Sequence, residues 1–285
     1  MNKAIERISK YLFLLTALIA VGAVLLICVF IFAGAFPALK EIGVIKFLTT
    51  TLWKPTDTPA SFGIFYMIIG SLYVTAGAMI IGVPIGVLAA IFMARYCPKR
   101  IYPFVSQLIK LMAGIPSIIY GFFGMMIIVP FISETFGGNG NSVLAASLVL
   151  SMMILPTVIT ISEDSLRAVP EIYYEGALAL GARKEEAVFK VVVPAAKNGI
   201  VTSVILATGR AIGETIAVAM VAGNSNILPI NILKPVRTLT VNIIQEMSYA
   251  SGLHYDALIA TGAVLFVFIL ILNILLNVLV RRKVK

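Results

Sequence analysis

Six long apolar runs decide the class of structure that this chain can form. A helix needs about 20 mostly apolar residues to cross a bilayer, and its backbone polar groups must be bonded within the helix. Only 12% of the residues are charged, whereas soluble domains average about 25%. We therefore expect one all-α, polytopic membrane domain over residues 1–285. Its six transmembrane helices are expected at Tyr11–Phe36, Tyr66–Ala94, Val105–Ile132, Val143–Ile161, Gly199–Val221 and Ala257–Val280.

The Lys and Arg residues are divided unequally between the two sides of these helices. Sixteen lie on the side of both termini, five lie on the other side, and Arg210 inside the fifth run completes the total of 22. Cytoplasmic loops carry the excess of Lys and Arg, so both termini are expected in the cytoplasm. Topology thus accounts for the net charge of +9 without a nucleic-acid partner. The first run is too long for a signal peptide, whose apolar region spans about 7–15 residues.

Two long loops have patterns of their own. The inner loop, 162–198, is expected to form two short helices at an angle, with Gly181 ending the first and Pro194 ending the second. Its exposed elbow could enter a groove on another protein or could be a plain connector. In the outer loop, 223–256, apolar residues at i, i+4 and i+8 predict a short helix that caps a pathway, receives a partner or is inert. The lone histidine, His254, is expected to be an ordinary loop residue.

The inner loop resembles the coupling loop of ABC importer permeases. That pattern is E-A-A, three residues, G, nine residues, I-x-L-P, and the matching positions are Glu175, Gly176, Ala177, Gly181, Val191, Val193 and Pro194. Gly176 replaces the Ala at the second position of E-A-A, and valines replace the Ile and the Leu. The resemblance implies a type I ABC importer permease fold (MetI-like) whose loop docks on an ATP-hydrolysing subunit. The chain lacks the G-x-x-x-x-G-K-[ST] phosphate loop, so we expect no enzyme activity, no cofactor and no metal here, with ATP and Mg in the partner.

A charged pair lies inside the fifth run. Twelve residues separate Asn198 from Arg210, about 18 Å of helix, which places the arginine near the middle of a hydrocarbon layer of about 30 Å. A central arginine costs from about 2.5 to more than 10 kcal/mol, so it must face protein or water. Glu214 follows one helical turn later and could neutralise it, but we favour a role in a translocation pathway. Arginine offers a fork of donors that matches phosphate or carboxylate oxygens. Gly209 and Gly213 flank the pair, and their spacing favours close helix packing.

Within the third run, residues 113–124 read "AGIPSIIYGFFG" and contain Pro116, several glycines, Ser117 and Tyr120. This combination predicts a segment that lines a cavity, although a proline can also be a simple kink.

Residues 114–124 and 209–224 closely resemble the phosphate-specific ABC importer, in its PstC-type permease rather than its PstA type, as do residues 238–240 and Glu246. The resemblance implies a PstA-like second permease, two PstB-like ATPase subunits and a PstS-like external phosphate-binding protein. It also places Arg210 and Glu214 in translocation. The alternatives are a permease for molybdate or sulfate, an ion-coupled secondary transporter, and a membrane assembly factor that transports nothing.

Overall fold

The structure is a computed structural model that describes residues 3–282; Lys283 and Lys285, counted above for topology, lie outside this range. Within this range it is mostly helical, with one short two-stranded hairpin. Five helices are long and apolar enough to cross a membrane, and the bent pair Lys184–Ala195 and Lys197–Gly213 makes a sixth if it is one span. The elements in chain order are α1 (Lys3–Ile42), α2 (Val44–Thr49), β1 (Trp53–Lys54), β2 (Ser61–Phe62), α3 (Phe65–Ile91), η1 (Phe92–Tyr96), α4 (Tyr102–Gly114), α5 (Ser117–Phe123), η2 (Gly124–Ile128), α6 (Val129–Phe136), α7 (Val143–Arg167), α8 (Glu171–Ala179), α9 (Lys184–Ala187), η3 (Val188–Val192), α10 (Val193–Ala195), α11 (Lys197–Gly213), α12 (Ile216–Val221), α13 (Leu239–Glu246) and α14 (Leu253–Arg282).

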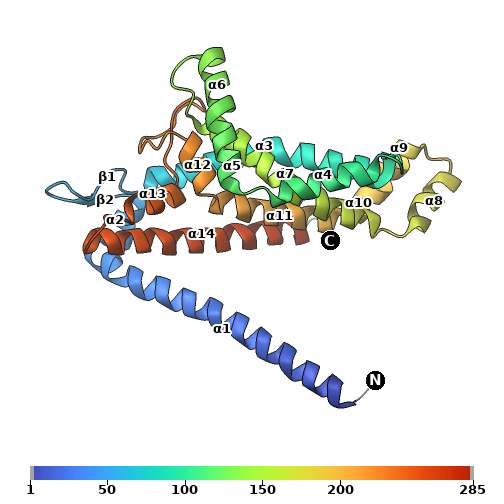
Figure 1. The fold of residues 1–285 in the computed structure, drawn as a ribbon, viewed down its shortest axis with the longest axis horizontal. Helices are drawn as coiled ribbons and strands as arrows, with labels where there is room; N and C mark the ends of the chain where they lie inside the picture. Colours follow the sequence, from blue (N-terminus) through green and yellow to red (C-terminus); the bar gives the residue numbers. More distant parts are fainter. Residues whose placement is uncertain (1–2, 283–285) are drawn as a thin grey trace.

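Helices α3, α7 and α11 form the centre of the molecule and lie side by side in Figure 1. Glycines on α3 allow α7 to approach closely, since a Cβ at Gly86 would lie 2.7 Å from a methyl carbon of Val158. The buried side chains between them are Val, Ala, Leu, Ile and Met. Small residues that let backbones approach are the usual basis of helix packing in membranes, where lipid removes the hydrophobic driving force.

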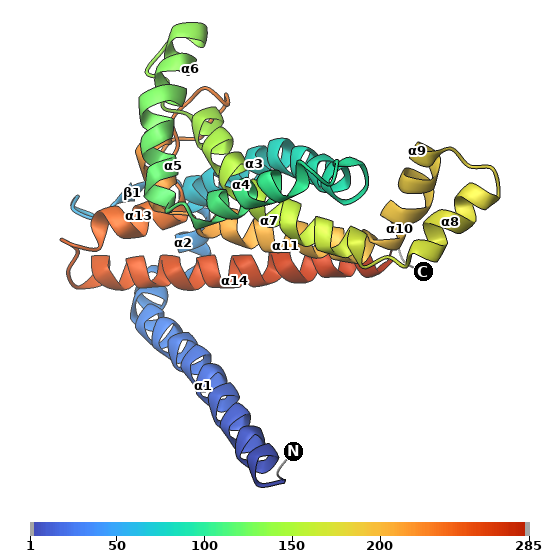
Figure 2. The same ribbon diagram turned by 45° about the vertical axis from the view of Figure 1, so that its right-hand side comes forward.

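The expected third span, 105–132, is not one straight helix. Helix α4 ends at Gly114, Ile115 is extended (φ −70°, ψ 125°), and Pro116 precedes α5. Proline lacks the backbone donor and disfavours helical conformation at the preceding residue. From this break α5, η2 and α6 leave the bundle at a steep angle, as Figures 1 and 2 show. The apolar helix of spanning length in this region is Ser117–Phe136, which begins after the break.

The expected fifth span, 199–221, is also broken, although it contains no proline. Helix α11 ends at Gly213, Glu214 is extended (φ −68°, ψ 133°), and α12 begins at Ile216. The freed backbone carbonyl of Glu214 accepts a hydrogen bond from Thr240 Oγ1 of α13 at 2.9 Å. The expectation that Arg210 and Glu214 lie one turn apart on a continuous helix is therefore wrong, because Glu214 is extended and its carbonyl bonds to α13 instead of to the next helical turn.

Helix α1 packs against the rest of the chain only near its C-terminal end. There a Cβ at Gly34 would lie 3.1 Å from Ile259, and the rings of Phe32 and Phe266 meet edge to face at 5.9 Å. The 18-residue apolar window of α1 has no buried residue, and Figure 1 shows the helix diverging from α14. Helix α1 therefore presents its apolar surface to lipid or to another chain.

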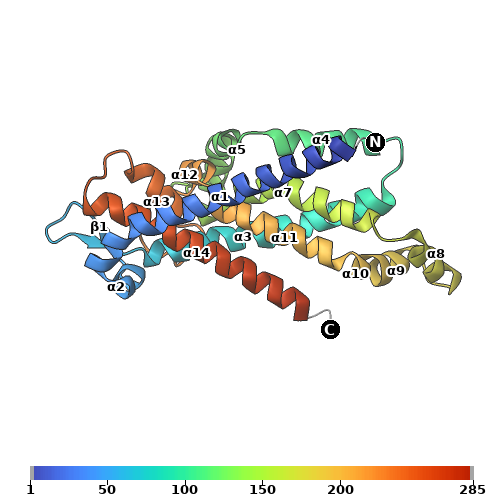
Figure 3. The same ribbon diagram turned by 90° about the horizontal axis from the view of Figure 1, so that it is seen from below.

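The two ends of the bundle carry different structures. At one end lie α2, α13 and the hairpin, in which Trp53 pairs with Phe62 in an antiparallel sheet. At the other end lie α8, α9 and α10, and the N-terminal end of α1 and the C-terminal end of α14 point toward it (Figures 1 and 3). The predicted inner helices are present: α8 is followed by Gly181 at φ +91°, and the chain bends by 66° between α10 and α11. Helix α13 is the short helix predicted in the outer loop.

Candidate functional site

Arg210 lies in the last turn of α11, and its side chain is exposed on this chain. Within residues 3–282 it makes neither a hydrogen bond nor an ion pair. The Tyr120 hydroxyl of α5 is near enough to interact electrostatically with the guanidinium of Arg210. A guanidinium at this depth needs a polar or charged partner, so the exposed face of α11 at Arg210 is where such a partner would bind.

Glu214 does not neutralise Arg210. Its carboxylate Oε1 accepts a hydrogen bond from the backbone nitrogen of Ala217 at 3.1 Å, which satisfies a free donor in the first turn of α12. The side chain is half-buried at the break between α11 and α12. The sequence leaves open an internal salt bridge or a role in a translocation pathway for this pair. The structure does not contain the salt bridge.

Ser117 and Tyr120 lie one turn apart on α5, which packs on α12. The contact is close because a Cβ at Gly121 would lie 2.8 Å from the Cα atom of Ala217. Tyr120 is buried, and its hydroxyl donates to the carbonyl of Met112 at 2.8 Å, across the break before α5. The Ser117 hydroxyl is half-buried and makes no hydrogen bond in the part of the chain that the structure describes. The structure thus brings Tyr120 near Arg210 and leaves Ser117 one turn away.

A groove of about 760 Å³ opens beside the break after α11. Neither Arg210 nor Glu214 lines it, but their neighbours Gly213 and Thr215 do. Most of the wall comes from α13 and the two residues that follow it, and α14 contributes Leu265. The lining residues are Gly213, Thr215, Ile216, Thr240, Ile243, Ile244, Met247, Ser248 and Leu265.

Gly209 and Gly213 do not make the close helix contact that their spacing favours. A Cβ at either position would meet no atom within 4 Å. Both glycines lie on α11 on either side of Arg210, so they leave open space around the arginine. The expectation of helix packing is wrong for the isolated chain, because no other helix among the described residues comes that close to either glycine.

Five of the seven motif positions are expected to contact the ATPase, and they lie on or beside α8 to α10. Glu175, Gly176, Gly181 and Pro194 are exposed and Ala177 is half-buried. No residue of α8 is buried, and Leu180 at the elbow that follows it is 91% exposed. Exposed apolar side chains on a surface of small residues are typical of a docking surface.

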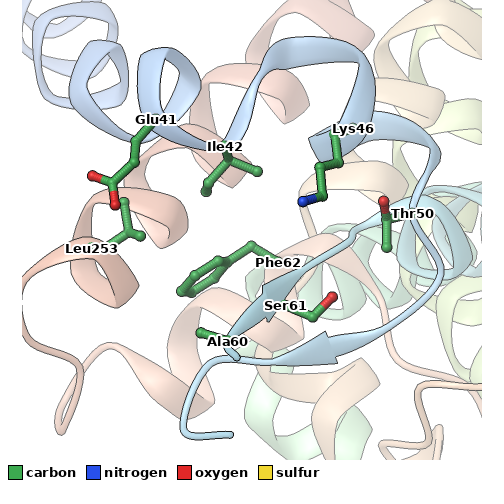
Figure 4. A pocket seen from close by; sticks show the side chains of 8 residues that line it. All are labelled: Glu41, Ile42, Lys46, Thr50, Ala60, Ser61, Phe62 and Leu253. Carbon is green, nitrogen blue, oxygen red and sulfur yellow. The ribbon is translucent and has the colours of Figure 1, made fainter. Parts of the chain in front are cut away.

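A second cavity, of about 310 Å³, lies at the hairpin end and is separate from these residues. Figure 4 shows Glu41 and Lys46 entering it from α1 and α2, and Ser61 and Phe62 from β2. It contains none of the predicted site residues. Both of its charged side chains are exposed.

An outer carboxylate cluster of Trp53, Arg237, Glu246 and His254 was not predicted as a unit. The buried carboxylate of Glu246 accepts from Trp53 Nε1 at 2.8 Å and from Arg237 at 2.7 Å, and it lies 2.9 Å from His254 Nε2. His254 is therefore a buried residue in the first turn of α14 and not an ordinary loop residue, which corrects the expectation. The sequence places these residues up to 201 positions apart, so only the fold could reveal the cluster.

An inner arginine cluster at the opposite end was also missed. It consists of Arg95, Tyr102, Glu163, Arg167, Glu171 and Tyr174. The hydrogen bond between Tyr102 and Glu163, followed by burial, raises the pKa of Tyr102. Arg95 and Arg167 appear in the sequence only as two of many inner basic residues, so nothing local distinguishes them. Among residues 3–282 no group of His, Cys, Asp and Glu could hold a metal ion.

Residues 82–285 match the family described as "Binding-protein-dependent transport system inner membrane component". The chain is 38% identical over 277 residues to the probable ABC transporter permease protein YqgH of Bacillus subtilis, with 94% of this chain and 89% of the relative covered. It is 34% identical over 262 residues to the phosphate transport system permease protein PstC of Mesorhizobium japonicum, with 85% and 79% covered. For PstC of Haemophilus influenzae the identity is 33% over 291 residues, with 95% and 90% covered.

Solved structures resemble the fold at low sequence identity. A bacterial alginate ABC transporter, in complex with an alginate pentasaccharide-bound periplasmic protein, has a TM-score of 0.67 at 14% identity, covering 100% of this chain and 99% of that one. The inward-facing MetNI methionine ABC transporter has a TM-score of 0.57 at 20% identity, covering 77% and 94%. These likenesses concern the arrangement of helices and not the substrate.

Proposed function

This chain belongs to the family of binding-protein-dependent transport system inner membrane components, and on that premise we propose that it is a permease subunit for inorganic phosphate. The chain is a multi-pass inner-membrane component of an ABC importer, with the type I (MetI-like) permease fold. Permeases of this family work with an ATPase in a separate subunit and with a binding protein. The identity of the solute and of the partners is what we propose here.

The observation that carries the proposal is the exposed guanidinium of Arg210, unpaired within residues 3–282, beside a break in a membrane helix. An unpaired cation at membrane depth favours an anionic solute, because only a charged or polar partner offsets its desolvation. Guanidinium geometry suits the oxygens of phosphate. Relatives named PstC, at 33–34% identity over most of the chain, support phosphate among the possible anions.

In the proposed mechanism Arg210 offers the compensating charge midway along the pathway. Glu214, whose carboxylate lies at the start of α12, could accept a hydrogen bond from a protonated phosphate once the backbone bond to Ala217 is released. The hydroxyls of Ser117 and Tyr120 on α5 would complete the wall of the pathway. This chain forms half of that pathway, and a PstA-like permease forms the other half over the exposed face of α11.

The inner loop couples this pathway to ATP hydrolysis. Glu175, Gly176, Ala177, Gly181 and Pro194 would contact one of two PstB-like ATPase subunits, which bind ATP and Mg. A PstS-like protein would deliver phosphate at the hairpin end. With both termini in the cytoplasm, α8 faces the ATPase and the outer loop faces the binding protein.

Uptake of radiolabelled phosphate into vesicles that contain the whole complex tests the proposal. We expect uptake that depends on ATP and on the loaded binding protein, with no competition from a tenfold excess of sulfate or molybdate. Uptake of sulfate or molybdate in preference to phosphate would instead assign the chain to another oxyanion. Uptake that follows an ion gradient without ATP would contradict the proposal altogether.

A further inference from the structure

Arg95 is a half-buried arginine that joins the inner end of α3 to α8. It lies in η1, and its side chain is 11% exposed. One terminal nitrogen lies 2.7 Å from Glu171 Oε2 at the start of α8, and the other donates to the carbonyl of Leu166 at 3.2 Å. Its guanidinium also lies 5.6 Å from the ring centroid of Tyr174. A single side chain therefore contacts α7 and two successive turns of α8.

Arg167 makes the reciprocal contacts from the end of α7. It donates to the carbonyl of Met93 in η1 at 3.0 Å, and its Nε donates to Glu163 at 2.8 Å. Its guanidinium lies 4.5 Å from the ring centroid of Tyr102, the first residue of α4. Each arginine thus donates to a carbonyl near the C-terminal end of the other's helix. Such carbonyls lack partners within the helix and attract cations, so the two arginines join the inner ends of α3 and α7.

The segment η1 gives Arg95 its position. Residues Phe92–Tyr96 form a π-helix, which inserts one extra residue into the turn and redirects the side chains that follow. Beneath the arginines lies an apolar core of Ile91, Met93, Leu166 and Val169. The ends of α7 and η1 are therefore held together by this core and by the hydrogen bonds of the two arginines, whereas α8 itself has no buried residue. Helix α8 also packs on α9 and η3, but its contacts at these ends give its movement a direct route to α3 and α7.

We propose that Arg95 is a positioning residue for transport, which transmits movement of α8 to the inner ends of α3 and α7. The inference rests on the proposed function, in which α8 contacts the ATPase. Its basis is the contact of one guanidinium with Glu171, Tyr174 and Leu166. Lysine could keep the ion pair but could not maintain the forked donation and the ring contact together.

The test compares Arg95→Gln, Arg95→Lys and Glu171→Gln in the complete complex reconstituted in vesicles. Two quantities are measured: the phosphate transported per ATP hydrolysed, and the stimulation of ATP hydrolysis by the loaded binding protein. We expect Arg95→Gln to lower the first about tenfold and to abolish the second, while ATPase subunits still copurify. Arg95→Lys should recover part of the loss. Glu171→Gln should change both quantities in the same direction, and adding it to Arg95→Gln should cause no further loss because both act through one contact.

Arg100→Gln is the matched control, since it removes an exposed arginine in the next turn that makes no hydrogen bond or ion pair within residues 3–282. It should behave as the unmodified complex. Glu171 has a side chain that is 58% exposed, so its variant remains informative if Arg95→Gln fails to fold. Unchanged coupling in both variants, or loss of the ATPase subunits from the complex, would overturn the inference. Failure of the unmodified complex to transport phosphate would instead contradict the proposed function.

Discussion

At the scale of single residues, the proposed phosphate pathway depends on Arg210. We expect Arg210→Gln to reduce phosphate uptake at least tenfold while the complex still assembles. Each hydrogen bond to a charged group contributes about 1.5–3 kcal/mol, and the side chain is exposed in this chain, so folding does not require it. Uptake by purified, reconstituted complexes is the measurement.

The control for that prediction is the same chemical change at Arg100, which is exposed in the inner turn. Its complex should transport phosphate normally. Normal uptake by a well-assembled Arg210→Gln complex would mean that the guanidinium does not contact the solute. In that case the exposed arginine would serve only to contact the second permease.

Glu246 is a residue whose role is structural. It accepts hydrogen bonds from Trp53 and Arg237 and contacts His254, so the substitution Glu246→Ala would leave buried donors without a partner. Breaking a buried pair costs about 3–5 kcal/mol. We expect Glu246→Ala to lower the thermal unfolding temperature of the purified protein, whereas Glu134→Ala, on the exposed part of α6, should leave it unchanged. Equal unfolding temperatures for the two variants would show that the cluster does not stabilise the outer end.

At the scale of helices, the sequence predicts which segments are apolar helices but not how they bend. Pro116 predicts a break in the third span. The direction of the helix after the break is not predictable from the sequence, because α5 packs on α12, which lies much further along the chain. No proline precedes the break at Glu214, so the sequence does not predict it. There Thr240, which lies 26 residues further along the chain, donates a hydrogen bond to the freed carbonyl of Glu214. The local sequence pattern therefore predicts Arg210 and Glu214 as candidate site residues, but it does not predict that the helix ends between them.

The contact between α5 and α12 leads to a prediction with an internal control. A Cβ at Gly121 would lie 2.8 Å from the backbone of Ala217, whereas a Cβ at Gly114 would meet nothing within 4 Å. Overpacking costs about 1–3 kcal/mol, and it would displace Tyr120 from Arg210. We expect Gly121→Ala to lower both thermal stability and phosphate uptake, and Gly114→Ala to change neither. If Gly121→Ala matched Gly114→Ala in both assays, the packing of α5 on α12 would not support the site.

The elbow after α8 provides a second comparison between glycines. Gly181 has φ +91°, a conformation that costs other residues roughly 1–2 kcal/mol. Gly176 lies within α8 with open space around it, and a helical alanine is favoured over glycine by about 0.5–1 kcal/mol. Gly181→Ala should therefore weaken copurification of the ATPase subunit, while Gly176→Ala should preserve it. Equal recovery of the ATPase with both variants would argue against a fixed elbow conformation.

At the scale of the whole molecule, the organisation of the chain follows from its length and charge more than from any motif. The apolar runs predict a six-span protein, and the structure has five such helices and a bent pair. What no pattern could give is the divergence of α1, because its apolar surface would suit lipid, another helix of this chain or a partner equally well. The two clusters at the ends of the bundle were missed for the same reason, since their members come together only in three dimensions.

The charge pattern and the fold together predict the orientation of the molecule in the membrane. The hairpin and α8 lie at opposite ends of the molecule in Figure 1, and the turn at 97–101 carries Lys99 and Arg100. Positive charge favours the cytoplasmic side, so this turn should be inside and the hairpin outside. In a chain with Cys28 and Cys97 replaced by serine, a membrane-impermeant maleimide should label Thr56→Cys in intact cells.

The partner variant, Lys99→Cys, should react only after the membrane is opened, because this exposed side chain is expected on the cytoplasmic side. Both variants must first transport phosphate, so that labelling reports the functional orientation. Labelling of Lys99→Cys in intact cells, with Thr56→Cys protected, would place α8 outside the cell. No ATPase could then reach the elbow, and the coupling role of the inner loop would fail together with the role of Arg95 in transmitting its movement.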